Sequence, residues 1–195
     1  RDFSLSAEGM QDDLSAVKEK FQETFIRVWR RDAENDGFNR LVLTGELQWH
    51  EIAMLRAYSK YMRQIGTNLS EAFIQQTLAS NANIAQMLMR LFRTHFDPEL
   101  GAAAMRGATG GSPAVSGRQL AAISLRAQIE DALEDVTNPD EDRILRLYLT
   151  LIEATLRTNY FQVDESGEPK SYVSFKLDPA LVPDLPLPRP RFEIW

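Results

Sequence analysis

One stretch of the sequence, residues 138–159, restricts the fold more than any other. It opens with Asn138-Pro139-Asp140-Glu141, which supplies a capping side chain, a proline at the first helical position and acids in the first turn. Apolar residues then surround most of the circumference of the expected helix. The polar residues form one narrow stripe: Arg146, Thr150, Glu153 and Arg157. A helix that is apolar on so many sides needs several neighbours, so we expect it to be the central helix of a bundle.

Five further segments repeat apolar residues at three- and four-residue steps, which is the period of an amphipathic helix. We expect these helices at about 11–31, 48–65, 70–80, 84–97 and 116–133. In the first of them the expected apolar face consists of Leu14, Val17, Phe21, Phe25, Val28 and Trp29. Residues 38–43 are expected to form only a short apolar turn. The sequence therefore predicts a mainly α fold, a helical bundle of about six helices.

Near the C-terminus the helical period gives way to alternation of apolar and polar residues, the pattern of a half-buried strand. This alternation is found in residues 172–177 and 191–195, on either side of a proline-rich connection. The same alternation in residues 2–5 is short and allows a strand at the N-terminus. A natural chain rarely stops on an exposed tryptophan in mid-strand, so we expect Trp195 to mark a point where a longer protein has been divided.

These patterns divide the chain into three expected parts. Residues 1–9 would be the tail of a preceding domain, residues 10–162 a helical domain, and residues 163–195 a short β segment that leads into a further domain. Within the helical domain, residues 98–117 are rich in glycine, alanine and serine. We expect them to form a flexible loop.

Charge and composition exclude several classes of function. The net charge of −6 and the pI near 5.1 argue against a general nucleic-acid or anionic-membrane binder. The absence of cysteine excludes disulfides, thiolate catalysis and cysteine-ligated metal centres. No apolar run approaches the ~20 residues that span a bilayer, and no signal-peptide pattern opens the chain. The cytoplasm is therefore the expected location.

Two histidines and one glycine run are the first candidates for chemistry. Neither His50 nor His95 has a second histidine at helical spacing, which a two-histidine metal site requires. We therefore expect structural or solvated roles for both histidines. The run Gly107–Gly111 has the composition of a phosphate-binding loop, but no strand precedes it and no Gly-Lys-Ser/Thr follows it. A linker is the preferred interpretation of this run.

Charged residues form two groups. Acids gather where two helices are expected to join: Glu130, Asp131, Glu134, Asp135, Asp140, Glu141 and Asp142. We interpret them as a solvated corner rather than a calcium or magnesium site, because the spacing of an EF-hand is missing. Arg56, Lys60 and Arg63 form a basic stripe on one helix. We expect this stripe to be a solvated face, or to contact acids elsewhere, rather than to bind an anion.

The remaining candidates are serines and methionines. No serine lies in the Gly-x-Ser-x-Gly elbow of the α/β-hydrolases. Four methionines are better explained as core filler than as a ligand-binding surface. They are Met54, Met62, Met87 and Met89. We therefore predict no catalytic, cofactor-binding or metal-ligating residue in this chain.

Six stretches of the sequence are more distinctive than their chemistry. They are residues 35–43, 51–58, 142–145, 152–161, 174–179 and 188–195. Together they resemble the large-subunit, NAD-specific glutamate dehydrogenases of bacteria, over nearly the whole chain except residues 100–117. In that family a long regulatory region with ACT-like modules precedes the catalytic part. The resemblance makes residues 10–162 a helical connecting domain and residues 163–195 the first strands of the catalytic substrate domain.

The resemblance implies a parent enzyme of bacterial glutamate catabolism that converts L-glutamate, NAD and water to 2-oxoglutarate, ammonia and NADH. The family's glutamate-binding motif, catalytic lysine and NAD-binding domain have no counterpart here. Lys170 and Lys176 lack the glycine-rich surroundings of that lysine. We therefore expect this chain alone to be inactive and to hold no cofactor, with NAD bound elsewhere in the parent enzyme. The expected partners are the rest of the polypeptide and further copies in a homo-oligomer, without nucleic acid or membrane.

The leading hypothesis is thus a non-catalytic helical segment that acts as a structural or regulatory linker. Two other interpretations stay open. One is a stand-alone helical module without enzymatic activity that docks a protein partner through exposed apolar residues. The other is a sensor that binds a small effector in a pocket between helices.

Overall fold

The computed structural model describes residues 14–100, 117–183, 185 and 187–195. This part of the chain contains seven α-helices, one 3-10 helix and three strands. The helices are α1 (Leu14–Trp29), η1 (Gly37–Arg40), α2 (Leu41–Thr44), α3 (Trp49–Gln64), α4 (Glu71–Ser80), α5 (Ala82–Phe96), α7 (Gly117–Glu134) and α8 (Pro139–Ala154). The strands are β1 (Thr155–Thr158), β2 (Phe175–Leu177) and β3 (Glu193–Ile194). The predicted mainly α fold with a short β segment near the C-terminus is confirmed.

Two of the predicted features lie outside the described residues. These are the strand allowed at residues 2–5 and nearly all of the loop expected at residues 98–117, including its glycine run. One expectation on the described residues was wrong: residues 38–43 are helical and do not form a turn. The Asp36 carboxylate accepts the N–H of Phe38 at 3.0 Å and so caps η1, and η1 passes directly into α2. This is why the structure has more helices than the sequence predicted.

Local signals at the helix ends explain where the longer helices begin. Ser70 accepts the N–H of Phe73, and Asn138 accepts the N–H of Asp140 ahead of Pro139. At the start of α3 the Glu51 carboxylate reaches back to the N–H of Gln48 at 2.9 Å, which is half of a capping box. Each of these bonds satisfies a backbone donor that a helix leaves free at its N-terminus.

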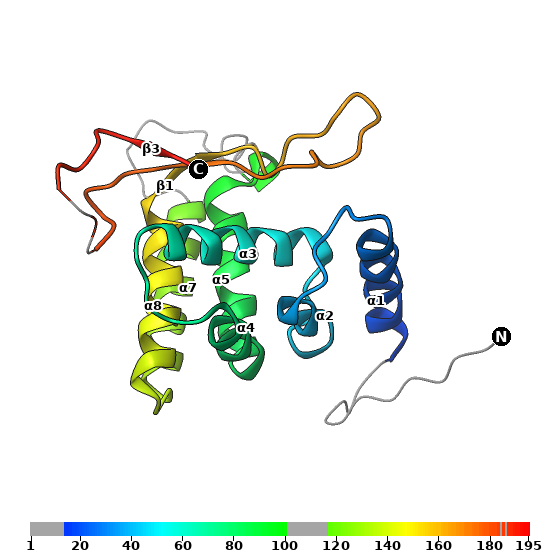
Figure 1. Ribbon diagram of the computed structural model, residues 1–195, viewed down its shortest axis with the longest axis horizontal. Helices are drawn as coiled ribbons and strands as arrows, with labels where there is room; N and C mark the ends of the chain where they lie inside the picture. The colour runs from blue at the N-terminus through cyan, green and yellow to red at the C-terminus, as the bar shows by residue number, and fades with distance from the viewer. Residues whose placement is uncertain (1–13, 101–116, 184, 186) are drawn as a thin grey trace.

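The most thoroughly buried helix is α3 and not α8. Eleven of the 16 residues of α3 are buried, against seven of the 16 in α8. Figure 1 shows why: α3 runs across the molecule, with the sheet on one side and α4, α5 and α8 packed around it. The helix expected at residues 138–159 does have several neighbours, since α8 contacts α4, α5, α7 and β1, but more residues are buried in α3. The burial of α3 was not predictable from its sequence, because polar residues such as Arg56 and Ser59 are buried among its apolar ones.

The helix that starts at Pro139 also ends earlier than its pattern predicts. Residues 155–158, expected in its last turn, form β1 and pair antiparallel with β2. Thr155 begins the strand, and its hydroxyl donates to the carbonyl of Leu151 at 2.7 Å. The N–H of Asp178, the residue after β2, donates to the carbonyl of Ala154 at 2.8 Å, a carbonyl that a continued helix would bond through its own backbone. Pairing with a strand about twenty residues away thus ends the helix.

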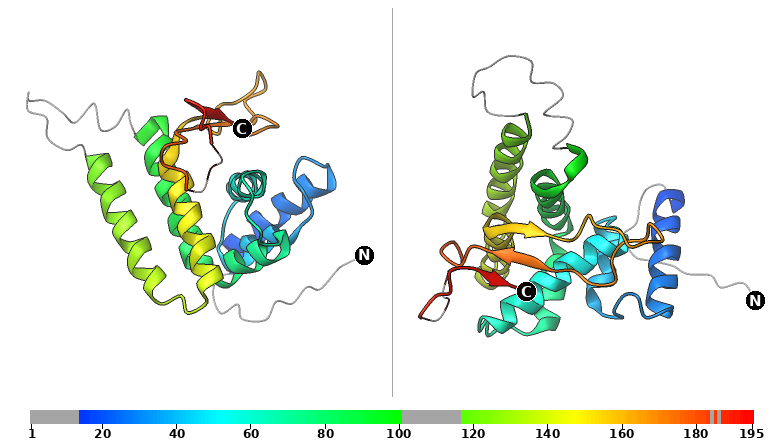
Figure 2. Two further views of the ribbon diagram at one scale, coloured as in Figure 1. Left: turned by 60° about the vertical axis from the view of Figure 1, so that its left-hand side comes forward. Right: turned by 90° about the horizontal axis from the view of Figure 1, so that it is seen from above.

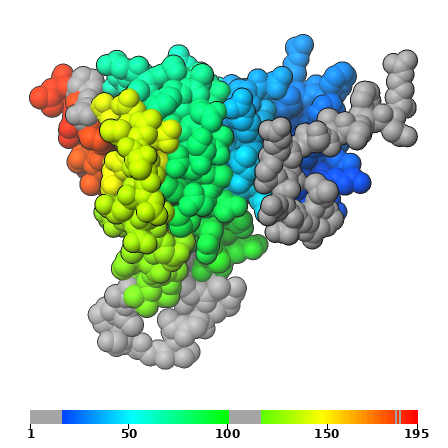
Figure 3. All heavy atoms as spheres, turned by 90° about the horizontal axis from the view of Figure 1, so that it is seen from below, coloured from blue at the N-terminus to red at the C-terminus, as the bar shows by residue number. Residues whose placement is uncertain are grey.

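The sheet has the order β1-β2-β3 and is antiparallel throughout. In the left view of Figure 2, α5, α7 and α8 lie side by side, while the strands cross near the ends of α5 and α8. α1 contacts α2 and α3 and stands at the other side of the molecule. The space-filling view of Figure 3 shows the same arrangement of the helices on the surface, with the blue α1 on one side and the yellow-green α7 and α8 on the other.

Candidate functional site

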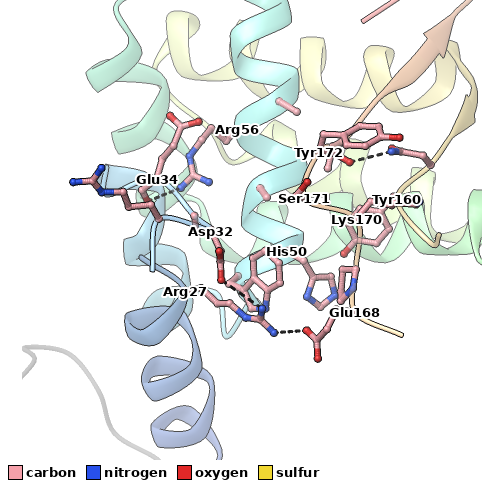
Figure 4. A pocket seen from close by; sticks show the side chains of 18 of the residues that line it. Arg27, Asp32, Glu34, His50, Arg56, Tyr160, Glu168, Lys170, Ser171 and Tyr172 are labelled. Carbon is pink, nitrogen blue, oxygen red and sulfur yellow. Dashed lines mark hydrogen bonds and ion pairs between the residues drawn. The ribbon is translucent and has the colours of Figure 1, made fainter. Parts of the chain in front are cut away.

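A large cavity of the described structure lies between α1, α3 and the hairpin that joins β1 to β2. Its volume is about 1010 Å³. We call it the hairpin cleft. In Figure 4, Arg27, Asp32 and Glu34 lie on one side, and Tyr160, Lys170, Ser171 and Tyr172 lie on the other, with His50 between them. The cleft is therefore lined by both charged and aromatic side chains.

One wall of the cleft contains a buried ion pair. The Arg56 guanidinium of α3 binds the Asp36 carboxylate through two hydrogen bonds: Nε lies 2.5 Å from Oδ2, and Nη2 lies 2.9 Å from Oδ1. Nη2 also donates to the Asn39 side chain at 3.1 Å and approaches the carbonyl of Glu34 at 3.4 Å. The Arg56 guanidinium lies 5.7 Å from the centre of the Phe38 ring. These contacts hold the segment before η1 against α3.

The rest of the predicted basic stripe also meets acids. Lys60 pairs with Glu34, and Arg63 pairs with Glu71 at 2.6 Å. The expectation that Arg56, Lys60 and Arg63 contact acids elsewhere is confirmed. The alternative, a solvated face, is wrong for Arg56, which is only 4% exposed. Since each of the three cations has a carboxylate partner, the stripe does not present free charge to an anion.

The mouth of the cleft is bridged by Arg27, which the sequence did not single out. Its Nη2 lies 2.7 Å from Glu168 Oε2 in the hairpin, and its guanidinium lies 4.8 Å from the centre of the Trp49 ring. The Trp49 indole N–H donates to Glu23 at 2.9 Å. Arg27 and Glu168 are 141 residues apart, so no local pattern could have revealed the pair. Hydrogen bonding to Glu168 raises the pKa of Arg27 further above its ordinary value.

His50 lies at the start of α3, half-buried in the cleft. Its ring centre is 5.7 Å from that of Trp49 and 5.5 Å from that of Tyr160. Burial lowers the pKa of His50 below the ordinary value of 6.5, so the ring is neutral at physiological pH. Burial also raises the pKa of Tyr160, whose hydroxyl is enclosed without a hydrogen-bond partner in the described structure. His50 thus acts as a packing residue between two aromatic rings.

His95 occupies the last turn of α5, as predicted, and is exposed. Its ring lies 5.9 Å from that of Phe96, and burial of part of the ring with the nearby charge of Arg118 lowers its pKa. Within the described part of the chain, neither histidine ring hydrogen-bonds a serine, threonine or acid. Such a bond would be expected if either histidine activated a nucleophile.

The predicted acidic corner is found at the α7–α8 junction. Arg146 binds Asp142 at 2.8 Å and Glu134 at 3.5 Å, Arg126 binds Glu130 at 3.1 Å, and Asn81 donates to Glu141 at 3.0 Å. The other three acids of the corner, Asp131, Asp135 and Asp140, are exposed. Among the described residues, no group of three or more His, Asp or Glu side chains could hold a metal ion.

The remaining candidates have structural roles. Met54, Met62 and Met89 are buried and Met87 packs against the core, which confirms their interpretation as core filler. Lys176 Nζ lies 3.6 Å above the Phe192 ring, and Lys170 lines the hairpin cleft. Among the described residues, no helix is both long and apolar enough to cross a membrane. The described side chains therefore offer mainly paired charges and aromatic packing. The Ser166 hydroxyl donates to the Asp164 carboxylate at 2.6 Å, in an exposed turn of the hairpin.

Comparison with known proteins places these features in a family. Residues 33–98 match the family "Glutamate dehydrogenase, helical motif 3", and residues 128–195 match "Bacterial NAD-glutamate dehydrogenase, catalytic domain". NAD-specific glutamate dehydrogenases of Pseudomonas aeruginosa and Halomonas elongata are 41% and 39% identical to the chain over its whole length. The chain belongs to the large bacterial NAD-specific glutamate dehydrogenases. The resemblance seen in the sequence is thereby confirmed.

The matches cover the whole chain but only a small part of the length of its relatives. The chain spans 11% of the length of the Pseudomonas and Halomonas enzymes. The enzyme of Mycobacterium tuberculosis is 36% identical over 94% of the chain, which is 10% of that enzyme. The match to the catalytic-domain family begins at residue 128, inside α7, and so includes the end of α7 and all of α8 as well as the sheet. The division of the chain at residue 162 stays a prediction.

Proposed function

We propose that this chain is a non-catalytic joint of an NAD-dependent glutamate dehydrogenase. It fixes the first strands of the catalytic region to the third helical motif. The enzyme that contains it would convert L-glutamate, NAD and water to 2-oxoglutarate, ammonia and NADH, with the reacting groups supplied by other parts of the polypeptide. The relatives are named for this NAD-specific enzyme.

One observation carries the proposal: the two family regions share a single hydrophobic core. Tyr58 of the helical-motif region packs on Phe175 of the catalytic region, with ring centres 4.8 Å apart. The Tyr58 hydroxyl is hydrogen-bonded to that of Thr155 at 2.8 Å. The Tyr148 hydroxyl donates to the carbonyl of Leu55 at 3.1 Å. The contacts therefore cross between the two regions at several points within the core.

The last strand is bound to the helical motif as well. The Tyr61 hydroxyl donates to the Glu193 carboxylate at 2.6 Å. Trp195 stacks on Phe175 with ring centres 5.2 Å apart, and the two residues exchange backbone hydrogen bonds of 2.9 and 3.0 Å. Burying one aromatic side chain contributes about 1.5–3 kcal/mol. A joint that buries Tyr58, Tyr61 and Phe175 together resists hinge motion between the two regions.

The first test is a calorimetric titration of this chain with NAD and with L-glutamate, beside the full-length enzyme. The joint is expected to bind neither ligand stoichiometrically, because Arg27, Arg56 and Lys60 in its cleft are paired with carboxylates and its described residues include no dinucleotide-binding turn. The full-length enzyme should bind both. Stoichiometric binding of NAD by the chain would contradict the non-catalytic role.

The second test uses substitutions in the full-length enzyme. Phe175→Ala removes a buried ring that three aromatic side chains contact, and is expected to lower the temperature at which activity is lost. The KM for NAD should stay the same, because the ring touches no substrate. The matched control is Tyr172→Ala, an aromatic residue on the same hairpin that is exposed and should tolerate truncation. Equal heat sensitivity of the two variants would argue against a joint at Phe175.

A further inference from the structure

The outer face of α1 carries apolar residues that nothing in the described structure covers. Phe25 is 59% exposed, Ile26 is 47% exposed and Trp29 is 80% exposed. The rings of Phe25 and Trp29 stack with centres 6.4 Å apart. We call these three residues the α1 patch. Phe25 and Trp29 thus belong to the apolar face expected for the first helix, but to a part of it that is exposed.

The exposure of the patch is not a sign of a loosely attached helix. The opposite face of α1 is packed, with Val17 and Thr24 buried and Phe21 half-buried against the core. Lys20 donates to the carbonyl of Glu46 at 2.6 Å. Together with the Trp49–Glu23 bond, this contact fixes the rotation of α1 about its axis. The α1 patch is therefore held outward by the fold.

Positive charge accompanies the patch. Lys18 lies on the same face two turns before Phe25, and Arg30 follows Trp29; both are exposed. Neither has an acidic partner among the described residues. Trp and Arg are the side chains that most often supply binding energy at protein interfaces. The chemistry fits a partner with an apolar strip and acidic residues beside it.

The size of the surface decides between possible partners. α1 has 16 residues and is therefore about 24 Å long, and a strip about 10 Å wide along it covers about 240 Å². A stable contact between two separate molecules needs about 800 Å² from each partner. A segment tethered in the same polypeptide needs far less area, because its effective concentration is high. The chain spans 11% of the length of its relatives, so such segments are available.

We propose that the α1 patch is a docking surface for another segment of the same glutamate dehydrogenase polypeptide, one that presents an apolar helix face flanked by acids. The inference depends on the length of the family members and not on the role as a joint. It can therefore fail while the joint survives.

Hydrogen exchange in the full-length enzyme tests this proposal. If a segment covers the patch, Trp29→Ser is expected to speed exchange of the α1 amides at least about tenfold. Arg30→Glu should speed it less, through the lost charge pair. The matched control is Val163→Ser, an exposed apolar residue on the hairpin, which should change nothing in α1. Unchanged exchange in peptides from α8 would show that each variant is folded.

Two results would overturn the proposal. One is equal exchange of the α1 amides in the parent enzyme, the Trp29→Ser variant and the Val163→Ser variant, which would mean that nothing covers the patch. The other is protection of α1 that disappears when the enzyme is diluted until its subunits separate. That outcome would make a second copy, and not the same polypeptide, the occupant.

Discussion

Replacing Arg56 by methionine removes the charge that neutralises Asp36 in the wall of the hairpin cleft. Arg56 is 4% exposed and the Asp36 side chain 16% exposed, so solvent can replace only a small part of the lost interaction. Removing one member of a buried ion pair typically costs about 3–5 kcal/mol, because the other charge stays buried. We expect Arg56→Met to lower the free energy of unfolding by an amount in this range. Asp36→Asn should have a similar effect, since it leaves Arg56 with only neutral acceptors.

The double variant separates the interaction from the loss of each side chain. With both charges gone, no unpaired charge remains, and the amide oxygen that Asp36→Asn introduces can still cap η1 in place of the carboxylate. The double variant should therefore be less destabilised than the sum of the single variants by about 1–3 kcal/mol. Urea unfolding followed by circular dichroism measures all four proteins of the cycle. Additive effects, or single variants within about 1 kcal/mol of the parent, would refute the buried-pair reasoning.

Three further predictions concern stability. Because burial lowers the pKa of His50 below 6.5, the unfolded chain takes up more protons than the folded one below about that pH. The free energy of unfolding should fall from about pH 7 to 5, and His50→Gln should flatten this profile in urea titrations. Asn138→Ala removes the bond to the Asp140 N–H and should cost about 1 kcal/mol by the same assay, whereas Asn138→Asp should not. Gly66 has φ +95°, so Gly66→Ala should lower the melting temperature through about 1 kcal/mol of backbone strain, whereas Gly117→Ala, where a Cβ meets nothing, should not.

Features that depend on neighbours in sequence were predictable. The cap at Asn138 and the start of α4 at Ser70 follow from residues within three positions, and both are found in the structure. The family resemblance was likewise visible in short stretches of sequence. The end of α8 was not predictable, because β1 forms only when β2 pairs with it from about twenty residues away.

The burial of individual side chains was also not predictable from the sequence. An amphipathic pattern shows that α1 has an apolar face, but the pattern does not show which part of that face other elements will bury. The fold buries Thr24, whose hydroxyl is satisfied by the carbonyl of Lys20 at 2.8 Å, and leaves Trp29 outside. Arg56 was expected in a solvated face or in contact with acids elsewhere, and its burial could not be predicted because its partner Asp36 lies on another element, 20 residues before it. The cross-cleft pair of Arg27 and Glu168 was missed for the same reason.

The central claim is that the helical-motif region and the start of the catalytic region form one cooperative unit. Tryptophan fluorescence tests it, because Trp49 reports on the first region and Trp195 on the second. Two variants of this chain, each with one of these tryptophans retained and the other two changed to phenylalanine, would be unfolded in urea. We predict for each variant that its fluorescence and the helical circular dichroism follow the same transition. Loss of the Trp195 signal at a urea concentration where the helices of that variant are still native would contradict the claim.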